Sequence, residues 1–265
     1  ARLIAPQDHD LHQKIVHQFC LHVPKLDLTL SPPALAGEIY AQLARVANIK
    51  DPFISIKKEA NERVLKLLPD LKKLVRKSPD PLRTSLHISI IGNYIDAGIA
   101  LKFDWEEAIH REDENNLATS DYSLFLEKLH QHKKIMILGD NAGEIGLDTL
   151  LVEQLQKMKI QVTYVVREKP ILNDATFEDA EKVGMSELCE VISSGVDTPG
   201  TVLERCSKEF LDRMKKTKLI ISKGQGNFEA LKDNWPGIFY AFKVKCPVVE
   251  RLTGHPVGSS MFAYI

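Results

Sequence analysis

The sequence predicts an α/β fold: a Rossmann-like, mostly parallel sheet with helices on both faces, preceded by an α-helical N-terminal subdomain. Apolar residues in the first half of the chain recur at the spacing of amphipathic helices. In the second half, short apolar runs alternate with helical patterns, as in parallel sheets covered by helices. Because the period changes near residue 130, we expect a helical subdomain over residues 1–130 and a Rossmann-like domain, carrying the functional site, over residues 131–265.

The helices of the first part are predicted from their start signals. Ser31-Pro32-Pro33 combines an N-cap residue with prolines in the first helical turn. Asp51-Pro52 and Asp80-Pro81 open two further helices in the same way. Residues 122–129 supply another short helix before the pattern changes.

Each predicted strand of the second part is a short apolar run. A run of this kind, bounded by polar loops, is typical of a strand that is buried on both faces. An apolar helical pattern follows the first strand and covers residues 145–155. The five predicted strands cover residues 134–139, 160–166, 188–193, 218–222 and 238–243.

Composition excludes several classes of protein. With 35 basic and 36 acidic residues, the chain lacks the clustered basic excess of a nucleic-acid-binding protein. A short basic run at residues 213–218 leads into a strand and is typical of a solvated helix end. The longest apolar runs fall far short of the roughly 20 residues that span a membrane. We therefore expect neither a nucleic-acid partner nor a membrane partner.

The four cysteines stand at positions 20, 189, 206 and 246, with no C-x-x-C pair among them. They are too few and too scattered for a disulfide framework or a structural zinc site. We interpret them as reduced, mostly buried thiols of a cytoplasmic protein.

Three polar loops follow predicted strands, at the sheet edge where α/β proteins bind ligands. In the first loop, residues 139–144, Asp140 and Asn141 offer two oxygen ligands to a hard cation such as Mg²⁺. Gly143 lets the backbone turn into a helix whose free N–H groups favour an anion. Asp140 or Asn141 could instead cap that helix, although capping needs only one of them. This loop by itself leaves both interpretations open.

The second loop, residues 169–176, contains Asn173 and Asp174. Asp174 stands where its carboxylate could complete a three-ligand cation site with the first loop. Helix capping is again the alternative, but Thr176 and Asp179 already form the pattern of a capping box. That box leaves Asn173 and Asp174 without a capping role, which favours a functional one.

The third loop, residues 222–227, contains Lys223, a point positive charge suited to a phosphate oxygen. Gln225 and Asn227 add amide donors. In isolation the segment would be an ordinary flexible loop with a surface lysine. Together, however, the three loops supply two carboxylates, several amides and a lysine, which are the groups needed to hold a cation and a phosphoryl group.

Several other chemistries lack their motifs. The chain has no P-loop, no nucleophile elbow and no H-E-x-x-H zinc motif. Gly139, Gly143 and Gly146 have the wrong spacing for a dinucleotide-binding loop. The haloacid dehalogenase pattern places a second Asp two residues after a nucleophilic one, and here that position is Ala142. This difference favours a metal-activated water over direct attack by Asp140, and both remain open.

The three loops together resemble the DUF89 family, the damage-control phosphatases, and most closely its prokaryotic branch. The resemblance rests on residues 139–144, 169–176 and 222–229. Residues 92–96, 197–202 and 245–248 are also similar to that branch, so the resemblance covers nearly the whole chain.

The resemblance implies a phosphatase that depends on a divalent cation, Mg²⁺ or Mn²⁺ with Co²⁺ or Ni²⁺ as alternatives, and hydrolyses small phosphorylated metabolites. It implies Asp140, Asn141 and Asp174 as the metal ligands. It also implies Lys223 as the lysine that contacts the phosphate, so Asp140 and Lys223 are the expected catalytic residues. The other residues expected near the substrate are Asn93, Glu144, Asn173, Gln225 and Asn227.

The sequence departs from that branch in two places. Members of that branch tend to begin with a C-x-x-C segment, and no such segment precedes Ala1 here, so either it has been cut from this sequence or the protein lacks it. Gly258-Ser259 stands where Gly-Asp is usual. Two rival functions remain. One is a carboxyl methyltransferase that uses S-adenosylmethionine, for which residues 139–146 make a poor cofactor loop. The other is a non-catalytic module that binds a metal or a nucleotide through the same ligands.

Overall fold

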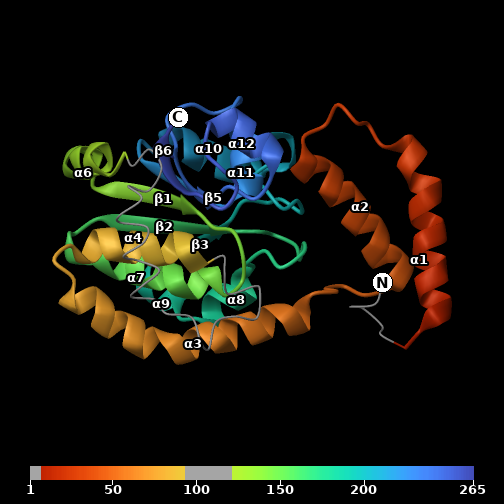
Figure 1. Ribbon diagram of the computed structural model, residues 1–265, viewed down its shortest axis with the longest axis horizontal. Coiled ribbons are helices and arrows are strands. Elements are labelled where there is room, and N and C mark those ends of the chain that lie inside the picture. Colours follow the sequence, from red (N-terminus) through yellow and green to blue (C-terminus); the bar gives the residue numbers. More distant parts are fainter. Residues whose placement is uncertain (1–6, 93–120) are drawn as a thin grey trace.

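The computed structural model describes residues 7–92 and 121–265 (Figure 1). Asn93, expected near the substrate, lies outside the described residues. The first two helices form a hairpin that extends from the body of the molecule (Figure 1). The described helices that precede the sheet in the chain are α1 (His9–His22), the 3₁₀ helix η1 (Val23–Lys25), α2 (Pro32–Ala47), α3 (Ile54–Lys77), α4 (Pro81–Ile91) and α6 (Tyr122–Gln131).

Two of the predicted helix starts are confirmed, and the third is displaced. Helix α2 begins directly after Ser31, and α4 begins directly after Asp80. The Asp80 carboxylate caps α4 by accepting a hydrogen bond of 3.0 Å from the backbone N–H of Arg83. Helix α3 begins only at Ile54, because Asp51 uses its carboxylate to accept the backbone N–H of Phe53 in a turn.

The second part of the chain forms a six-stranded sheet with the strand order β3-β2-β1-β4-β5-β6. The first five strands in the chain run parallel, and β6 pairs antiparallel with β5. This order is that of a Rossmann fold, and it confirms the predicted fold class. The strands are β1 (Lys134–Leu138), β2 (Gln161–Val166), β3 (Glu190–Ser193), β4 (Ile220–Lys223), β5 (Phe239–Lys243) and β6 (Ser260–Tyr264).

Helices cover both faces of the sheet. One face packs against α4, α6, α7 (Glu144–Lys157), α8 (Phe177–Lys182) and α9 (Met185–Leu188). The other packs against α10 (Lys208–Lys216), α11 (Gln225–Leu231), α12 (Pro247–Thr253) and the start of α2. Between β3 and α10 the chain also forms a 3₁₀ turn, η4 (Leu203–Arg205).

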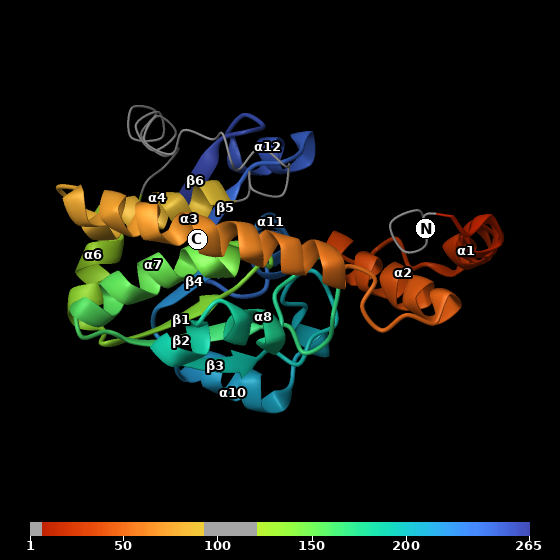
Figure 2. The same ribbon diagram turned by 90° about the horizontal axis from the view of Figure 1, so that it is seen from below.

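Helix α3 adds a third layer. It lies across α4 and α7 (Figure 2), where Val64, Leu68 and Leu71 share a core cluster with Leu147 and Leu150 of α7. Because α7 packs against the sheet on one side and against α3 and α4 on the other, it is buried almost all round. This burial explains why its apolar residues do not form a single stripe.

The strand order places the switch point of the sheet between β1 and β4. The chain proceeds from β1 to β2 on one side and from β4 to β5 on the other, so the loops that leave these two strands diverge. In open α/β sheets this switch point is the usual place for a ligand. Within residues 7–92 and 121–265, no helix is both long enough and apolar enough to cross a membrane.

Candidate functional site

Backbone hydrogen bonds hold the first two loops together at the carboxyl ends of β1 and β2. The N–H of Ala142 donates to the carbonyl of Asn173, and the N–H of Ala175 donates to the carbonyl of Asp140, both at 2.8 Å. Between these two bonds, Asn141 and Asp174 form an isolated β-bridge. The structure therefore brings together the three residues that were expected to hold a cation.

Asp140 carries a buried carboxylate. Its side chain is 8% exposed and accepts a hydrogen bond of 3.1 Å from the Asn141 amide. No described Lys, Arg or His forms an ion pair with it. Burial raises the pKa of Asp140, and the positive charges of Lys245, Arg167 and Lys223 only partly oppose that effect. A buried carboxylate in these surroundings is costly, and a cation would offset the cost.

The donor set fits a hard cation. Asp140 and Asp174 offer carboxylate oxygens, and the side-chain amide of Asn141 offers one further oxygen. The described residues contain no group of three or more His, Cys, Asp or Glu side chains placed to hold a metal ion. A cation here would therefore rely on two carboxylates and one amide, with water and substrate completing its coordination, as is usual for Mg²⁺.

The third loop closes over Asp140 from β4. Gly224 has φ +81° and ψ 151°, a backbone conformation that is essentially restricted to glycine. A Cβ at this position would lie 2.1 Å from Oδ2 of Asp140. The glycine is thus required both by its backbone conformation and by the close approach of the carboxylate.

We expect Gly224→Ala to reduce the rate of phosphate release per folded molecule by at least about a hundredfold, because the new methyl group would displace Asp140. Gly184→Ala is the control, since Gly184 also has a positive φ, +78°, but its Cβ would meet no atom within 4 Å. Both activities would be measured on protein whose folded fraction is known from circular dichroism. Equal activity in the two variants would contradict this role of Gly224.

Arg167 supports Asp174 and was not singled out in the sequence. It follows β2 directly and is 1% exposed. Its Nε donates to Oδ2 of Asp174 at 2.7 Å, and its Nη2 donates to Oδ1 of Asn227 at 3.1 Å. Arg167 therefore fixes one oxygen of Asp174 and links the second loop to the third. Its only signal in the sequence is a charged residue at the end of a buried apolar strand.

Two further carboxyl groups have strongly raised pKa values. Burial raises the pKa of Asp174 to about 7 against the opposing charge of Arg167. Burial and the neighbouring Asp140 raise the pKa of Glu144 to about 8. The Glu144 carboxylate accepts a hydrogen bond of 2.8 Å from the Asn141 amide. Burial therefore disfavours the ionised forms of all three carboxyl groups, and a bound metal ion would favour those forms.

Cation binding should therefore depend on pH. The pKa of Asp174 is raised to about 7, so at lower pH its carboxyl group must lose a proton before it can bind a metal ion. We expect the affinity for Mn²⁺, measured by calorimetry, to rise from about pH 6 to about pH 8, by up to tenfold per unit below that pKa. An affinity that stays constant over this range would contradict the assignment.

Lys223 lies at the site, but its ammonium group already has partners. It is 1% exposed and donates to Oδ1 of Asp148 at 2.8 Å and to the carbonyl of Ser89 at 3.0 Å. Its third neighbour is Oε2 of Glu144, at 3.9 Å. Burial lowers the pKa of Lys223, but the charges of Asp148 and Glu144 outweigh burial and raise it. The lysine therefore stays charged beneath the site.

Asp148 was not singled out in the sequence either. It is fully buried in α7 and accepts hydrogen bonds from Ser89 and, at 2.6 Å, from the hydroxyl of Tyr164. Three donors from α4, β2 and β4 thus converge on one carboxylate. Asp148 stands one helical turn after Glu144, so it shares a helix face with that residue.

The amides of the third loop hold backbone segments in place. Asn227 is fully buried, donates to the carbonyls of Gly139 and Lys223, and accepts from Thr201 and Arg167. Gln225 accepts the backbone N–H of Lys245 at 2.9 Å. These contacts brace the loops after β1, β4 and β5 against one another.

Helix α3 is joined to the first loop through Asn61. The Asn61 amide oxygen accepts the N–H of Gly143 at 2.7 Å, and its nitrogen donates to Asp179 at 2.8 Å. Asp179 is also the acid of the predicted capping box with Thr176, which is confirmed. The helical part of the chain thus fixes the turn between Asp140 and α7.

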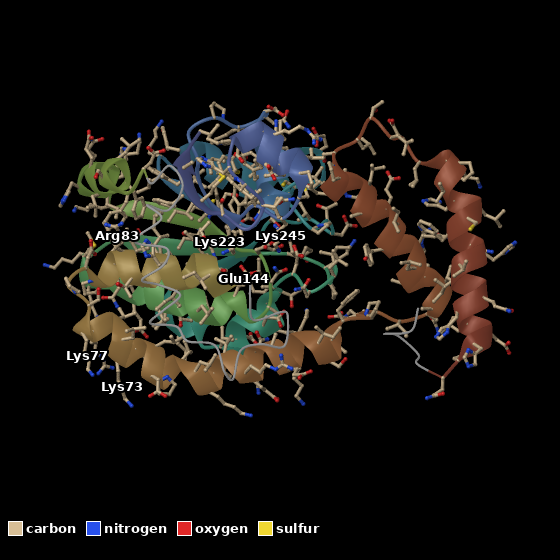
Figure 3. All side chains as sticks on the ribbon, in the orientation of Figure 1. Lys73, Lys77, Arg83, Glu144, Lys223 and Lys245 are labelled. Carbon is tan, nitrogen blue, oxygen red and sulfur yellow. The ribbon has the colours of Figure 1, made fainter. Side chains whose placement is uncertain are left out.

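Lys245 is an exposed lysine near the site. It follows β5 and lies near Glu144 and Lys223 (Figure 3). Its charge is the first of those that lower the raised pKa of Asp140. The sequence contains no separate indication of a role for Lys245. It belongs to residues 245–248, one of the segments on which the family resemblance rests.

Comparisons with known proteins identify the family of this chain. The family described as "Damage-control phosphatase ARMT1-like domain" matches residues 2–261. A damage-control phosphatase of Pyrococcus horikoshii is 32% identical over 97% of this chain and 90% of its own length. A damage-control phosphatase of Archaeoglobus fulgidus is 31% identical over 84% of this chain and 79% of its own length.

The solved structures include a close fold neighbour. A DUF89 family protein from Pyrococcus horikoshii superposes with a TM-score of 0.82 and 29% identity, covering 99% of this chain and 93% of its own.

An uncharacterized protein of Methanocaldococcus jannaschii is 35% identical over 86% of this chain and 79% of its own length. The family match, the curated relatives and the shared fold agree, and the chain therefore belongs to the DUF89 family of ARMT1-like damage-control phosphatases.

Proposed function

We propose that this chain is a divalent-metal-dependent phosphatase of small phosphorylated metabolites, such as sugar phosphates or related damaged or unwanted metabolites. One observation carries the proposal: Asp140 is buried beside Asn141 and Asp174 at the switch point of the sheet, and no described Lys, Arg or His forms an ion pair with it. The names of its archaeal relatives, damage-control phosphatases, support the same activity.

In this proposal, Asp140, Asn141 and Asp174 hold the cation. A cation bound there would polarise the phosphoryl group and lower the pKa of a water molecule. Arg167 keeps Asp174 oriented, and Asn141 orients Glu144. We assign the attack on phosphorus to water, because Ala142 stands where a second acid would serve an aspartyl nucleophile. Oxygen-18 in the Asp140 carboxylate after one turnover in labelled water would overturn that assignment.

Two lysines would interact with the negative charge of the substrate phosphate, each from a different position. Lys223 stays charged beneath Glu144 and would offset charge that develops on the phosphoryl oxygens. Lys245 is exposed, and its charge would draw the phosphate in.

We expect Lys245→Gln to raise the KM for a phosphorylated substrate about tenfold, because an exposed charge-assisted hydrogen bond is lost. The effect on kcat should be smaller, because the cation and Lys223 remain. Steady-state kinetics at low ionic strength would measure both parameters. Lys77→Gln, an exposed lysine on α3, is the control, and an equal KM for the two variants would contradict this role.

The activity itself is tested by phosphate release from a panel of sugar and nucleotide monophosphates. The assays would contain Mg²⁺, Mn²⁺, Co²⁺ or Ni²⁺, or a chelator. We expect release that requires a cation and stops with the chelator. Folded protein that releases no phosphate with any cation would refute the proposal. Calorimetry with S-adenosylmethionine, and metal or nucleotide binding without turnover, would then separate the two rival functions.

A further inference from the structure

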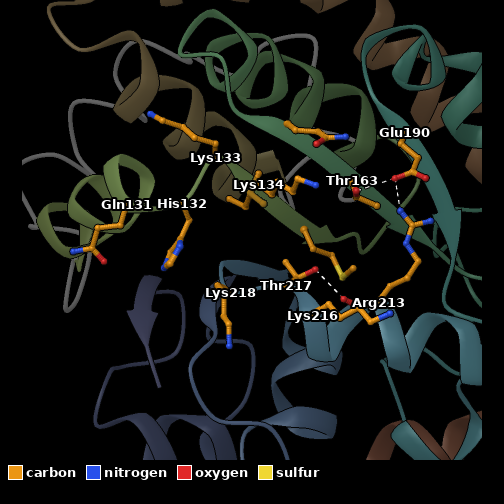
Figure 4. Close-up of a pocket in the computed structure, with 13 residues that line it drawn as sticks. Gln131, His132, Lys133, Lys134, Thr163, Glu190, Arg213, Lys216, Thr217 and Lys218 are labelled. Atoms are coloured by element: carbon orange, nitrogen blue, oxygen red, sulfur yellow. Dashed lines mark hydrogen bonds and ion pairs between the residues drawn. The ribbon is translucent and has the colours of Figure 1, made fainter.

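A second cavity lies at the opposite edge of the sheet from Asp140. It has a volume of 430 Å³ and opens at the amino ends of β1, β2 and β4 (Figure 4). A hollow of this size is within the range of small-molecule sites. Six basic residues line it: His132, Lys133, Lys134, Arg213, Lys216 and Lys218.

The only carboxylate that lines this cavity, among the described residues, is already paired. Glu190 forms an ion pair with Arg213 and accepts a hydrogen bond of 3.0 Å from Thr163. The hydrogen bond from Arg213 holds the pKa of Glu190 below its usual range. In the part of the chain that the structure describes, Lys133, Lys134, Lys216 and Lys218 form no ion pair. The cavity therefore has a net positive charge.

Helix ends explain some of these charges but not all of them. Arg213 and Lys216 lie in the last turn of α10, where basic residues oppose the negative end of the helix dipole. Lys134 begins β1, and Lys218 directly precedes the apolar residues that lead into β4, so neither caps a helix. Their charges need another explanation.

Lys134 and Lys218 stand at the amino ends of neighbouring strands. Lys134 is the first residue of β1, and Lys218 lies two residues before β4 begins at Ile220. Both side chains line the cavity together with Lys133 and Lys216. Like charges gathered around one cavity repel one another. A bound anion would reduce that repulsion.

We propose that this cavity binds a small anion with three or more negative charges, such as an oligophosphate or a polycarboxylate. Lysine ammonium groups on flexible side chains suit such a ligand as point charges. The cavity lies at the amino ends of the strands and shares no lining residue with the three loops. The proposal is therefore independent of the phosphatase activity.

Calorimetric titration with inorganic triphosphate, in the presence of chelator and at low salt, tests the proposal. We expect binding that weakens steeply with added salt. The double variant Lys134→Gln/Lys218→Gln should bind at least about tenfold more weakly. The control is Lys73→Gln/Lys77→Gln, which removes two exposed lysines of α3 (Figure 3) and should bind as the wild type does. Lys245→Gln, at the other edge of the sheet, shows whether triphosphate binds at the proposed phosphatase site instead.

A second measurement tests the repulsion itself. Without any multivalent anion, the double variant should melt at the same temperature as the wild type or higher, because two of the like charges around the cavity are removed. Triphosphate should then raise the melting temperature of the wild type but not that of the double variant. The proposal is overturned by the absence of binding, by equal binding in wild type and double variant, or by binding that only Lys245→Gln abolishes.

Discussion

Replacing Lys223 by Met is expected to lower the free energy of unfolding by about 3–5 kcal/mol. The side chain of Asp148 is fully buried, and Lys223 is the cation bonded to it, at 2.8 Å. Methionine fills a similar volume but leaves the Asp148 charge unpaired, with only the hydroxyls of Ser89 and Tyr164 to support it. Denaturant titration of the metal-free protein would measure the loss.

The matched control is Lys73→Met, which removes a lysine from an exposed pair with Asp70. We expect it to change stability by no more than about 0.5 kcal/mol. The double variant Lys223→Met/Asp148→Asn removes both buried charges and keeps an acceptor for Tyr164, so it should be more stable than Lys223→Met alone. If Lys223→Met is as stable as Lys73→Met, the buried pair does not support the fold.

Asp174→Asn is expected to lower kcat/KM by at least about a thousandfold, because a cation ligand that stabilises the transition state by several kcal/mol is lost. It should also abolish Mn²⁺ binding in calorimetry. The fold should survive, since the amide oxygen of Asn can still accept the Nε hydrogen bond that Arg167 makes to Asp174.

Asp212→Asn serves as the control, because Asp212 is an exposed carboxylate on α10. It should bind Mn²⁺ and hydrolyse substrate as the wild type does. If Asp174→Asn keeps wild-type activity and Mn²⁺ affinity, Asp174 is not a ligand.

Most of the sheet could be predicted from the sequence because its strands are buried on both faces. Strands β1, β2 and β4 are continuous apolar runs that end in polar loops, so their pattern indicates both their position and their direction. Strand β6 was not predicted. It lies at the edge of the sheet and pairs antiparallel with β5, and residues 260–264 form only a short apolar run at the chain end.

The loops at the site could be predicted because they contain several polar residues side by side. Asp140-Asn141 and Asn173-Asp174 stand out beside the apolar strands, and the rule for α/β sheets places them at one edge. Their backbone bridge could not be predicted, because it depends on the register between two loops.

The supporting residues were missed because each is a single charge within an apolar segment. Asp148 lies inside the apolar pattern of α7, and Arg167 ends β2. Only the folded structure shows that Asp148 meets Lys223 and that Arg167 meets Asp174. The sequence likewise suggests an accessible Lys223, whereas the folded chain buries it beneath Glu144.

The central claim is that one divalent cation lies between Asp140, Asn141 and Asp174. Anomalous diffraction from crystals grown with Mn²⁺ tests it most directly, with crystals of Asp174→Asn as the comparison. We expect one anomalous peak in coordination distance of all three side chains in the wild type, and none there in the variant. A wild type that hydrolyses phosphomonoesters with Mn²⁺ but shows no peak at these residues, or holds the ion elsewhere, would contradict the claim.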